Sequence, residues 1–250
     1  MKDGFRIFDT HTHIGAARHN GRSYSPDALL RAMDSYGIDR SVAIPFPVVE
    51  DFRRQHDIVG DAVGRYPDRL IGAACLSPFL PLAEFKQELH RCSDEYGFRV
   101  LKLQPQYHGL NPLHGSSDFF FDAALQNNLT VICHTGSGLP FSAPSLYMMP
   151  AHKFPELKIV LGHCGGGMFF HEAIVAALFC PNIFLELSTL MPHQVLEVLK
   201  HVPSERLMIG SDMPESLETE IGKILTLPIA AEDKQRILNG TAAGVFVEGA

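Results

Sequence analysis

Residues 7–15 read Ile-Phe-Asp-Thr-His-Thr-His-Ile-Gly. A short apolar run leads into His11 and His13, which stand two positions apart. On a β-strand, side chains at i and i+2 point to the same face, so these two imidazoles would lie side by side where the strand ends. Such a pair can hold one metal ion. Roughly 0.7 His-x-His pairs are expected by chance in a chain of this composition, so the motif needs support from elsewhere.

Three other apolar runs also end in a potential metal ligand. Val-Ile-Cys ends in His134, Val-Leu-Gly ends in His163, and Met-Ile-Gly-Ser ends in Asp212. Continuous apolar runs of this length are typical of parallel strands that are buried on both faces. The pattern therefore places several ligand types at the carboxyl ends of strands.

Eight apolar runs alternate with eight helical patterns along the 250 residues. This number and the chain length predict a single-domain (β/α)8 TIM barrel over residues 1–250, with an extra C-terminal helix over 232–238. The helix over 28–36 has Ser25 as its N-cap, Pro26 in its first turn and Gly37 after its end. The expected strands are 6–10, 40–45, 70–77, 99–103, 130–134, 158–163, 182–188 and 206–211.

An open, doubly wound sheet is the alternative architecture. It would build its ligand site from two or three strand ends at one switch point. Here the polar residues follow at least five strands spread over the whole chain, and only a closed barrel brings all those ends to one rim. The distribution favours the barrel.

Composition limits the classes of partner. The formal net charge is −7, and no cluster of Lys and Arg could neutralise phosphates, which argues against nucleic acid. We expect no membrane span, because no apolar stretch has the necessary length, and no secretory signal at residues 1–4. The five widely spaced cysteines are typical of reduced thiols in a cytoplasmic protein. We expect a small-molecule substrate and take a homodimer as a candidate assembly.

Each candidate ligand also has an ordinary structural interpretation. A single histidine at a strand end is commonly a hydrogen-bonded, partly buried side chain, and Asp212 before Met213-Pro214 fits a helix N-cap. Taken together, four histidines and one aspartate at the same end of their strands favour a metal site. Strand 8 neighbours strand 1 in a closed barrel, which would bring Asp212 beside His11 and His13.

These motifs resemble the amidohydrolase superfamily, and within it the amidohydrolase-related branch of metal-dependent TIM-barrel hydrolases. The resemblance rests on Asp-Thr-His-Thr-His, His134-Thr-Gly, Gly162-His163-Cys-Gly-Gly and Gly210-Ser-Asp212-Met-Pro, and on the ending Asn239-Gly-Thr-Ala-Ala-Gly-Val-Phe. It implies that His11, His13, His134 and Asp212 bind one divalent metal. It also implies that His163 acts in catalysis or joins a second metal.

Lys102, in Val-Leu-Lys-Leu-Gln, points either into the barrel or toward the helices. An inward, unmodified lysine would pair with a substrate anion or with a carboxylate such as Asp9 or Glu186. Elsewhere in the superfamily that the chain resembles, a lysine on this strand is carboxylated and bridges two metals. We favour one metal and an unmodified Lys102; a stoichiometry near two metals per chain would reverse that choice.

The expected chemistry follows from the ligands. A divalent ion, with Zn2+ favoured and Mn2+, Fe2+ or Co2+ as alternatives, lowers the pKa of its water toward about 7. Asp212 would accept the proton and pass it to the leaving group, and His163 would polarise or protonate the substrate carbonyl. Such a site cleaves amides, esters or lactones.

Three alternatives remain open. Related sites catalyse non-oxidative decarboxylation of small carboxylic acids, some lactonases of this branch act without metal, and a metal-binding barrel without activity is conceivable. The loops supply Arg18, Gln104, Tyr107 and His108 as candidate substrate-binding residues, which suit a small carboxylated or hydroxylated molecule. Gly165-Gly166-Gly167 either presents N–H groups to an anion or gives the chain clearance beside the metal rim.

Overall fold

The apolar runs form parallel strands. In this computed structural model, which describes residues 1–247, one sheet has the strand order β2-β1-β3-β4-β5-β6-β7-β8-β9. All neighbours pair in parallel except β2, which pairs antiparallel with the end of β1. The strands are β1 (Phe8–Ala16), β2 (Ser23–Tyr24), β3 (Arg40–Pro45), β4 (Leu70–Ala74), β5 (Val100–Leu103), β6 (Thr130–His134), β7 (Ile159–Gly162), β8 (Ile183–Glu186) and β9 (Leu207–Met208).

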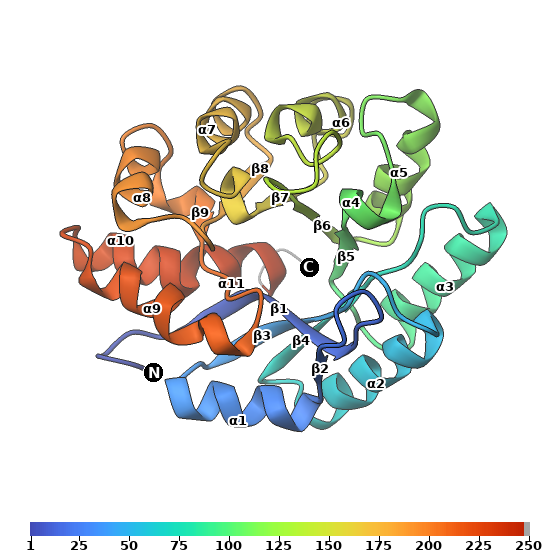
Figure 1. Cartoon of the computed structure of the whole chain (residues 1–250), viewed down its shortest axis with the longest axis horizontal. Helices are drawn as coiled ribbons and strands as arrows, with labels where there is room; N and C mark the ends of the chain where they lie inside the picture. The colour runs from blue at the N-terminus through green and yellow to red at the C-terminus, as the bar shows by residue number, and fades with distance from the viewer. Residues whose placement is uncertain (248–250) are drawn as a thin grey trace.

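The sheet is curled, and backbone hydrogen bonds connect the segment after β9 to β1. Thr10 N donates to Ile209 O over 3.1 Å, and Asp212 N donates to His11 O over 2.6 Å. Figure 1 shows the strands in the centre of the molecule, with the helices arranged around them. The prediction of an α/β fold built on a curled, mainly parallel sheet is confirmed. The last strand is shorter than the predicted 206–211, because the chain pairs irregularly with β1 and Asp212 has a positive φ of 63°.

Helices follow the strands in the predicted order and cover the outside of the sheet (Figure 1). Ser25 Oγ accepts a hydrogen bond from Ala28 N over 3.1 Å, and Gly37 has a φ of 69°, so α1 begins and ends where the capping residues predict. No helix within residues 1–247 is long and apolar enough to cross a membrane. The outer helices are α1 (Pro26–Tyr36), α2 (Phe52–Arg65), α3 (Leu82–Asp94), α5 (Asp118–Gln126), α6 (Met148–Lys153), α7 (Phe170–Phe179), α8 (Pro192–Leu199) and α9 (Leu217–Thr226).

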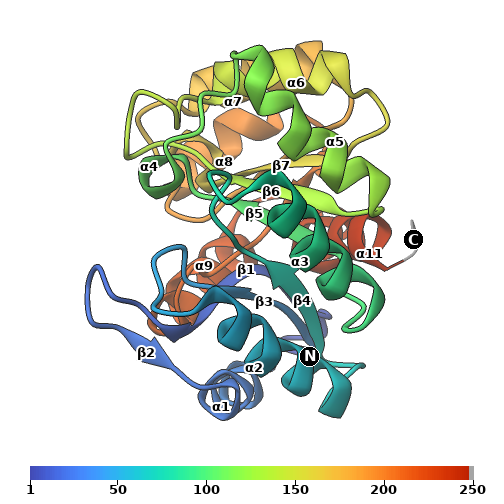
Figure 2. The same ribbon diagram turned by 90° about the vertical axis from the view of Figure 1, so that its right-hand side faces the viewer.

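The C-terminal segment covers the amino-terminal end of the strands. It comprises α10 (Ala231–Gln235), a π-helical turn (Arg236–Gly240) and α11 (Thr241–Phe246), so the single helix expected over 232–238 was too short. Val245 and Phe246 of α11 join the inner core with the inward side chains of the strands, among them Phe8 and Val100. Figure 2 shows α11 at the opposite side of the molecule from β2 and the short helix α4 (Pro105–His108). The C-terminal segment therefore does not cover the carboxyl ends of the strands, where the loops carry the candidate site.

Candidate metal centre and active site

Three imidazoles surround one carboxylate oxygen at the carboxyl end of the sheet. Asp212 Oδ1 lies 3.5 Å from His11 Nε2, 3.6 Å from His13 Nε2 and 3.8 Å from His163 Nε2. Ligand atoms that each lie ~2.1 Å from one tetrahedral ion are roughly 3.4 Å apart. His11 and His13 therefore have the spacing from Asp212 that a single ion requires, and the ligand atoms of the three residues all lie within 4.8 Å of one another.

His134 lies at the edge of this group. Its ring centroid is 4.7 Å from that of His163, and it lines the same pocket as His13 and Asp212. Its Nε2 is hydrogen-bonded to the carbonyl of Ser137 over 2.9 Å. To coordinate a metal through Nε2, His134 must break this hydrogen bond to Ser137.

Asp9 fixes the loop that carries Asp212. Asp9 accepts hydrogen bonds from Ser211 N over 2.9 Å and from Ser211 Oγ over 2.6 Å. Burial raises the pKa of Asp9 to about 7, although these hydrogen bonds oppose the shift. Gly210 precedes this loop because a Cβ there would lie 2.7 Å from atoms of Glu186 and His11. This role of Asp9 was not predicted, although its place two residues before His11 marks it as part of the same strand motif.

Glu186 organises two of the histidines. His11 Nδ1 donates to Glu186 Oε2 over 3.0 Å. Ser188 Oγ donates to the same oxygen over 2.9 Å and lies 2.6 Å from His163 Nδ1. Because a carboxylate only accepts, Nδ1 of His11 carries the hydrogen, and because the Ser188 hydroxyl donates to Glu186, Nδ1 of His163 carries one too. Both histidines therefore turn the lone pair of Nε2 toward Asp212, and Ser188, which the sequence did not single out, is part of the site.

The side chain of Lys102 points toward His11, on the inner face of the curled sheet, and has no exposed surface. Its Nζ lies 2.8 Å from His11 Nε2, and it donates because that nitrogen carries no hydrogen. Burial lowers the pKa of Lys102 from its usual value. A cation bound at His11 Nε2 would displace this contact.

The protonation states of the side chains in the site favour binding of a cation. Burial lowers the pKa of His13 and of His134 to about 4, and lowers that of His163 well below its usual value. Burial alone would raise the pKa of Asp212, but the neighbouring imidazoles and Lys102 hold it well below its usual range. At neutral pH the imidazoles are neutral and Asp212 is ionised, which is the protonation state that binds metal.

A pocket of about 170 Å³ opens above these residues. Of the substrate-binding candidates, Gln104 and Tyr107 line this pocket, together with His19 and Phe46. Arg18 instead lines a separate cleft of about 870 Å³ beside β2. His108 is buried and accepts a hydrogen bond at Nδ1 from Gln104 N over 3.3 Å.

The glycine-rich turn after β7 provides clearance. Gly165 N donates to Thr135 Oγ1 over 2.9 Å, and Gly166 N donates to His163 O over 2.6 Å. A Cβ on Gly136 would lie 2.9 Å from the backbone of Gly165 and Gly166. Two of the three N–H groups in this turn are thus used within the protein, and the close chain crossing accounts for the glycines.

A second group of ligand types, His56, Glu88 and Cys92, is buried between α2 and α3. His56 Nδ1 is hydrogen-bonded to Glu88 Oε1 over 2.7 Å, and His56 Nε2 accepts from Cys75 N over 3.0 Å. Arg91 Nη2 donates to the same Glu88 oxygen over 2.7 Å. Both ring nitrogens are engaged and a cation already faces Glu88, so this network supports the fold and is not prepared for a metal.

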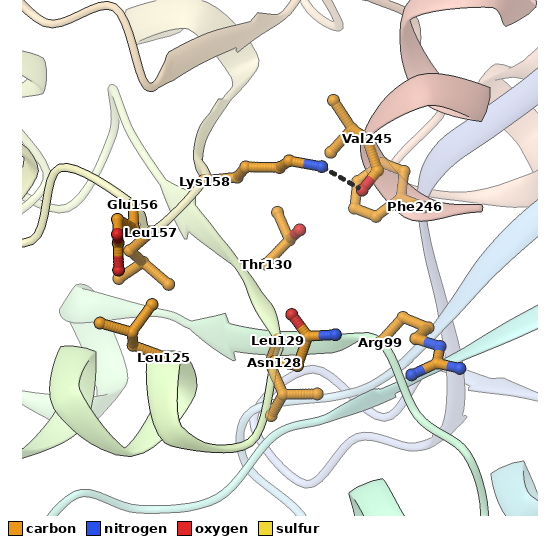
Figure 3. Close-up of a pocket in the computed structure, with 10 residues that line it drawn as sticks. All are labelled: Arg99, Leu125, Asn128, Leu129, Thr130, Glu156, Leu157, Lys158, Val245 and Phe246. Carbon is orange, nitrogen blue, oxygen red and sulfur yellow. Dashed lines mark hydrogen bonds between the residues drawn. The ribbon is translucent and has the colours of Figure 1, made fainter. Parts of the chain in front are cut away.

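A cavity of about 100 Å³ lies beside α11, at the end of the strands away from the candidate metal centre. Figure 3 shows Lys158 in this cavity with its Nζ directed at the carbonyl of Val245, over 3.2 Å. Lys158, directly before β7, is hydrogen-bonded to α11, so this cavity belongs to the packing of the C-terminal helix.

A family model described as amidohydrolase matches residues 8–246. The chain belongs to the amidohydrolase family. Members of this family are enzymes, so the expectation of an enzyme and the resemblance stated from the motifs are both confirmed. No curated protein matches the sequence of this amidohydrolase.

Solved structures show the same fold at low sequence identity. An uncharacterised TIM-barrel protein from Bordetella bronchiseptica is 19% identical with a TM-score of 0.80, over 98% of this chain and 99% of that chain. The 5-carboxyvanillate decarboxylase of Novosphingobium aromaticivorans, complexed with manganese, is 17% identical with a TM-score of 0.77, over 98% and 97%. A probable 2-pyrone-4,6-dicarboxylic acid hydrolase from Acinetobacter baumannii is 17% identical with a TM-score of 0.70, over 96% and 99%.

Proposed function

We propose that this amidohydrolase binds one divalent cation through His11, His13 and Asp212, with His134 as a fourth ligand, and hydrolyses an amide, ester or lactone bond in a small substrate. The observation that carries the proposal is the position of Asp212 Oδ1, 3.5 to 3.8 Å from the Nε2 atoms of three histidines. The donor set of imidazole nitrogens and one carboxylate suits Zn2+, which we favour, and also Mn2+, Fe2+ and Co2+.

A closed barrel is part of this proposal. The hydrogen bonds from Thr10 N to Ile209 O and from His13 N to Asp212 O, each 3.1 Å, support a continuous seam between the first and last strands. That seam would hold Asp212 against His11 and His13 as a fixed unit, although about 200 residues separate them in sequence.

The bound cation would supply a water of lowered pKa and polarise the substrate carbonyl. Asp212 is ionised and accepts a proton at Oδ1. His163 carries its hydrogen on Nδ1, so its Nε2 is an acceptor: it must first take up a proton before it can donate one to a leaving group. Asp212 Oδ1 and His163 Nε2 lie 3.8 Å apart, which is too far for a direct hydrogen bond, so a proton would pass between them through one water or through the substrate.

A second candidate function is non-oxidative decarboxylation of a small carboxylic acid. The fold similarity to a manganese-containing decarboxylase favours it, together with the stacking of Phe46 on His13, with ring centroids 5.1 Å apart, which suits a flat substrate. In this reaction the bond that breaks is between the carboxyl carbon and the ring, and the ring carbon gains a proton.

The two reactions are distinguished by their products. Protein loaded with Zn2+ or Mn2+ is incubated with lactones, N-acyl compounds and aromatic carboxylates, and acid release and CO2 release are measured in parallel. Hydrolysis predicts acid release without CO2, and Asp212→Asn should slow this release by about 10²- to 10⁴-fold. CO2 release from an aromatic acid would establish the second function instead. Acid release by Asp212→Asn or by metal-free protein at a rate close to that of the metal-loaded parent would overturn the proposal.

A further inference from the structure

The turn that follows β8 has a strained backbone. Leu190 N donates to Leu187 O over 3.4 Å, which closes a four-residue turn directly after Glu186. Within this turn Thr189 has a φ of 67°. A β-branched residue adopts this left-handed conformation only where its surroundings enforce it. Contacts from outside the turn must therefore stabilise it.

Two charged residues of α9 provide these contacts. Glu220 and Lys223 form an ion pair, and each side chain is at most 10% exposed. Glu220 Oε1 accepts a hydrogen bond from Thr189 N over 3.0 Å. Lys223 Nζ donates to Leu187 O over 2.7 Å and to Leu190 O over 3.0 Å. The pair thus binds three backbone groups of the turn.

A buried ion pair is a poor means of attaching a helix. Removing two charges from water is costly, and apolar residues of similar volume often stabilise a fold as well or better. Leu217, Ile221 and Ile224 already pack α9 into the hydrophobic core. Within residues 1–247, every hydrogen bond between the side chains of Glu220 and Lys223 and the backbone goes to this one turn. The specific contribution of the pair is therefore to the conformation of the turn.

The turn carries Ser188, which contacts the candidate active site. Ser188 donates to Glu186 from its backbone N over 2.5 Å and from its Oγ over 2.9 Å. Its Oγ accepts from His163 Nδ1 over 2.6 Å. The next acceptor for this nitrogen is Glu186 Oε2, at 3.9 Å, which is too far for a hydrogen bond. The position of Ser188 therefore decides whether the hydrogen of His163 stays on Nδ1.

We propose that Glu220 and Lys223 are positioning residues for His163. By holding the turn after β8, they keep Ser188 in place as the acceptor for His163 Nδ1. This fixes one tautomer and leaves Nε2 of His163 as the acceptor that faces Asp212. The inference rests on the proposed function for the part of His163 in proton transfer, whereas the tautomer can be measured without any reaction.

The tautomer of His163 is measured by nitrogen-15 NMR of metal-free, histidine-labelled protein at pH 7, with its signals assigned by their loss in His163→Gln. Ring nitrogens with and without a hydrogen give separate signals. The parent should show a single tautomer, with the hydrogen on Nδ1. Ser188→Ala removes the acceptor and should populate both tautomers. His13, whose Nδ1 is hydrogen-bonded to Pro45 O over 3.3 Å, is the internal standard and should not change.

Glu220→Leu combined with Lys223→Met removes both charges at similar volume and leaves neither unpaired. This double variant should populate both tautomers of His163, as Ser188→Ala does. Glu88→Gln weakens the hydrogen bonds between α2 and α3, and as the control for a general loss of stability it should keep the single tautomer. A folded double variant with a single His163 tautomer would overturn the proposal, and so would the same change in Glu88→Gln.

Lys223→Met alone carries the test if the double variant does not fold. Burial raises the pKa of Glu220, so this carboxyl can take up a proton once Lys223 is removed and still accept from Thr189 N. The carbonyls of Leu187 and Leu190 lose their donor, and a minor population of the second His163 tautomer should appear. An unchanged His163 would then overturn the proposal. Failure to hydrolyse any compound would count against the proposed function alone, because the NMR measurement needs neither metal nor substrate.

Discussion

His11 donates a hydrogen bond from Nδ1 to Oε2 of Glu186 over 3.0 Å, and neither side chain has any exposed surface. The same oxygen accepts from Ser188 Oγ, which is hydrogen-bonded in turn to His163. One buried carboxylate thus sets the tautomer of two imidazoles from different strands. Partners of this kind orient metal ligands and raise their basicity.

Glu186→Gln should weaken divalent metal binding by about 10- to 100-fold, because an amide cannot accept from His11, Ser188 and the backbone in the same way. Metal titration of the two proteins measures the change. Glu197→Gln, which removes a partly exposed carboxylate on α8, is the matched control and should bind metal like the parent. Equal affinity in Glu186→Gln would show that this carboxylate does not support the metal ligands.

Asp212→Asn should reduce turnover by about 10²- to 10⁴-fold, the usual contribution of a positioned acid–base group. The fold should persist, because asparagine tolerates the positive φ of 63° at this position. Steady-state kinetics and thermal unfolding of the same preparation separate the two effects. Turnover close to that of the parent would contradict the proposed proton route.

Glu88→Gln should destabilise the protein in a pH-dependent way. Burial alone would raise the pKa of Glu88, but hydrogen bonds from His56 and Arg91 lower it from its usual value of 4.5 to about 2. Ionised Glu88 therefore stabilises the folded state above pH 4.5, and this contribution is lost as the pH falls toward 2. The shift corresponds to about 3 kcal/mol at neutral pH.

Denaturant unfolding at pH 7, 4 and 3 measures this dependence. The free energy of unfolding of Glu88→Gln should lie below that of the parent at pH 7, and the difference should shrink toward pH 3. A difference that stays constant with pH would mean that packing, and not charge, dominates at this position.

Gly136→Ala should destabilise the chain crossing that supports His163. Gly136 has a φ of 106°, and a Cβ would lie 2.9 Å from the backbone of Gly165 and Gly166. We expect a loss of about 2 kcal/mol or more, because backbone on both sides cannot move away easily. Gly222→Ala on α9 is the control: it meets no atom within 4 Å, and alanine favours the helix by up to about 1 kcal/mol. Equal unfolding temperatures of the two variants would exclude the proposed crossing constraint.

Much of the fold was readable from local signals. Val-Ile-Cys-His specifies a strand that ends in His134, and Val-Leu-Gly-His specifies a strand that ends at Gly162, directly before His163. Ser25, Pro26 and Gly37 specify the bounds of α1 within about two residues. The two-residue strand β2 was not predicted, because Ser23 and Tyr24 have no apolar pattern and pair only where β1 extends past His13. The full length of the C-terminal helices was not predicted either, because Val245 and Phe246 are specified by the inner core and not by helical periodicity.

The candidate site was readable in part. The sequence pointed to His11, His13, His134 and Asp212 as metal ligands and to His163 as a catalytic residue. The structure brings His11, His13 and His163 within 4 Å of Asp212 Oδ1, whereas Nε2 of His134 is hydrogen-bonded to the carbonyl of Ser137. It could not show that Ser188 links His163 to Glu186, since that contact depends on the local bend after β8. Nor could it show that Arg18 and Gln104 face different cavities, because the path of the loop after β1 is set by pairing with β2 and by the hydrogen bond from Arg18 N to Val48 O.

The metal site is tested most directly by a crystal structure of metal-loaded protein with diffraction recorded at the metal absorption edge. We predict one anomalous peak per chain, about 2.0–2.2 Å from His11 Nε2, His13 Nε2 and a carboxylate oxygen of Asp212. A peak coordinated elsewhere, or an active protein with no peak among these three residues, would contradict it.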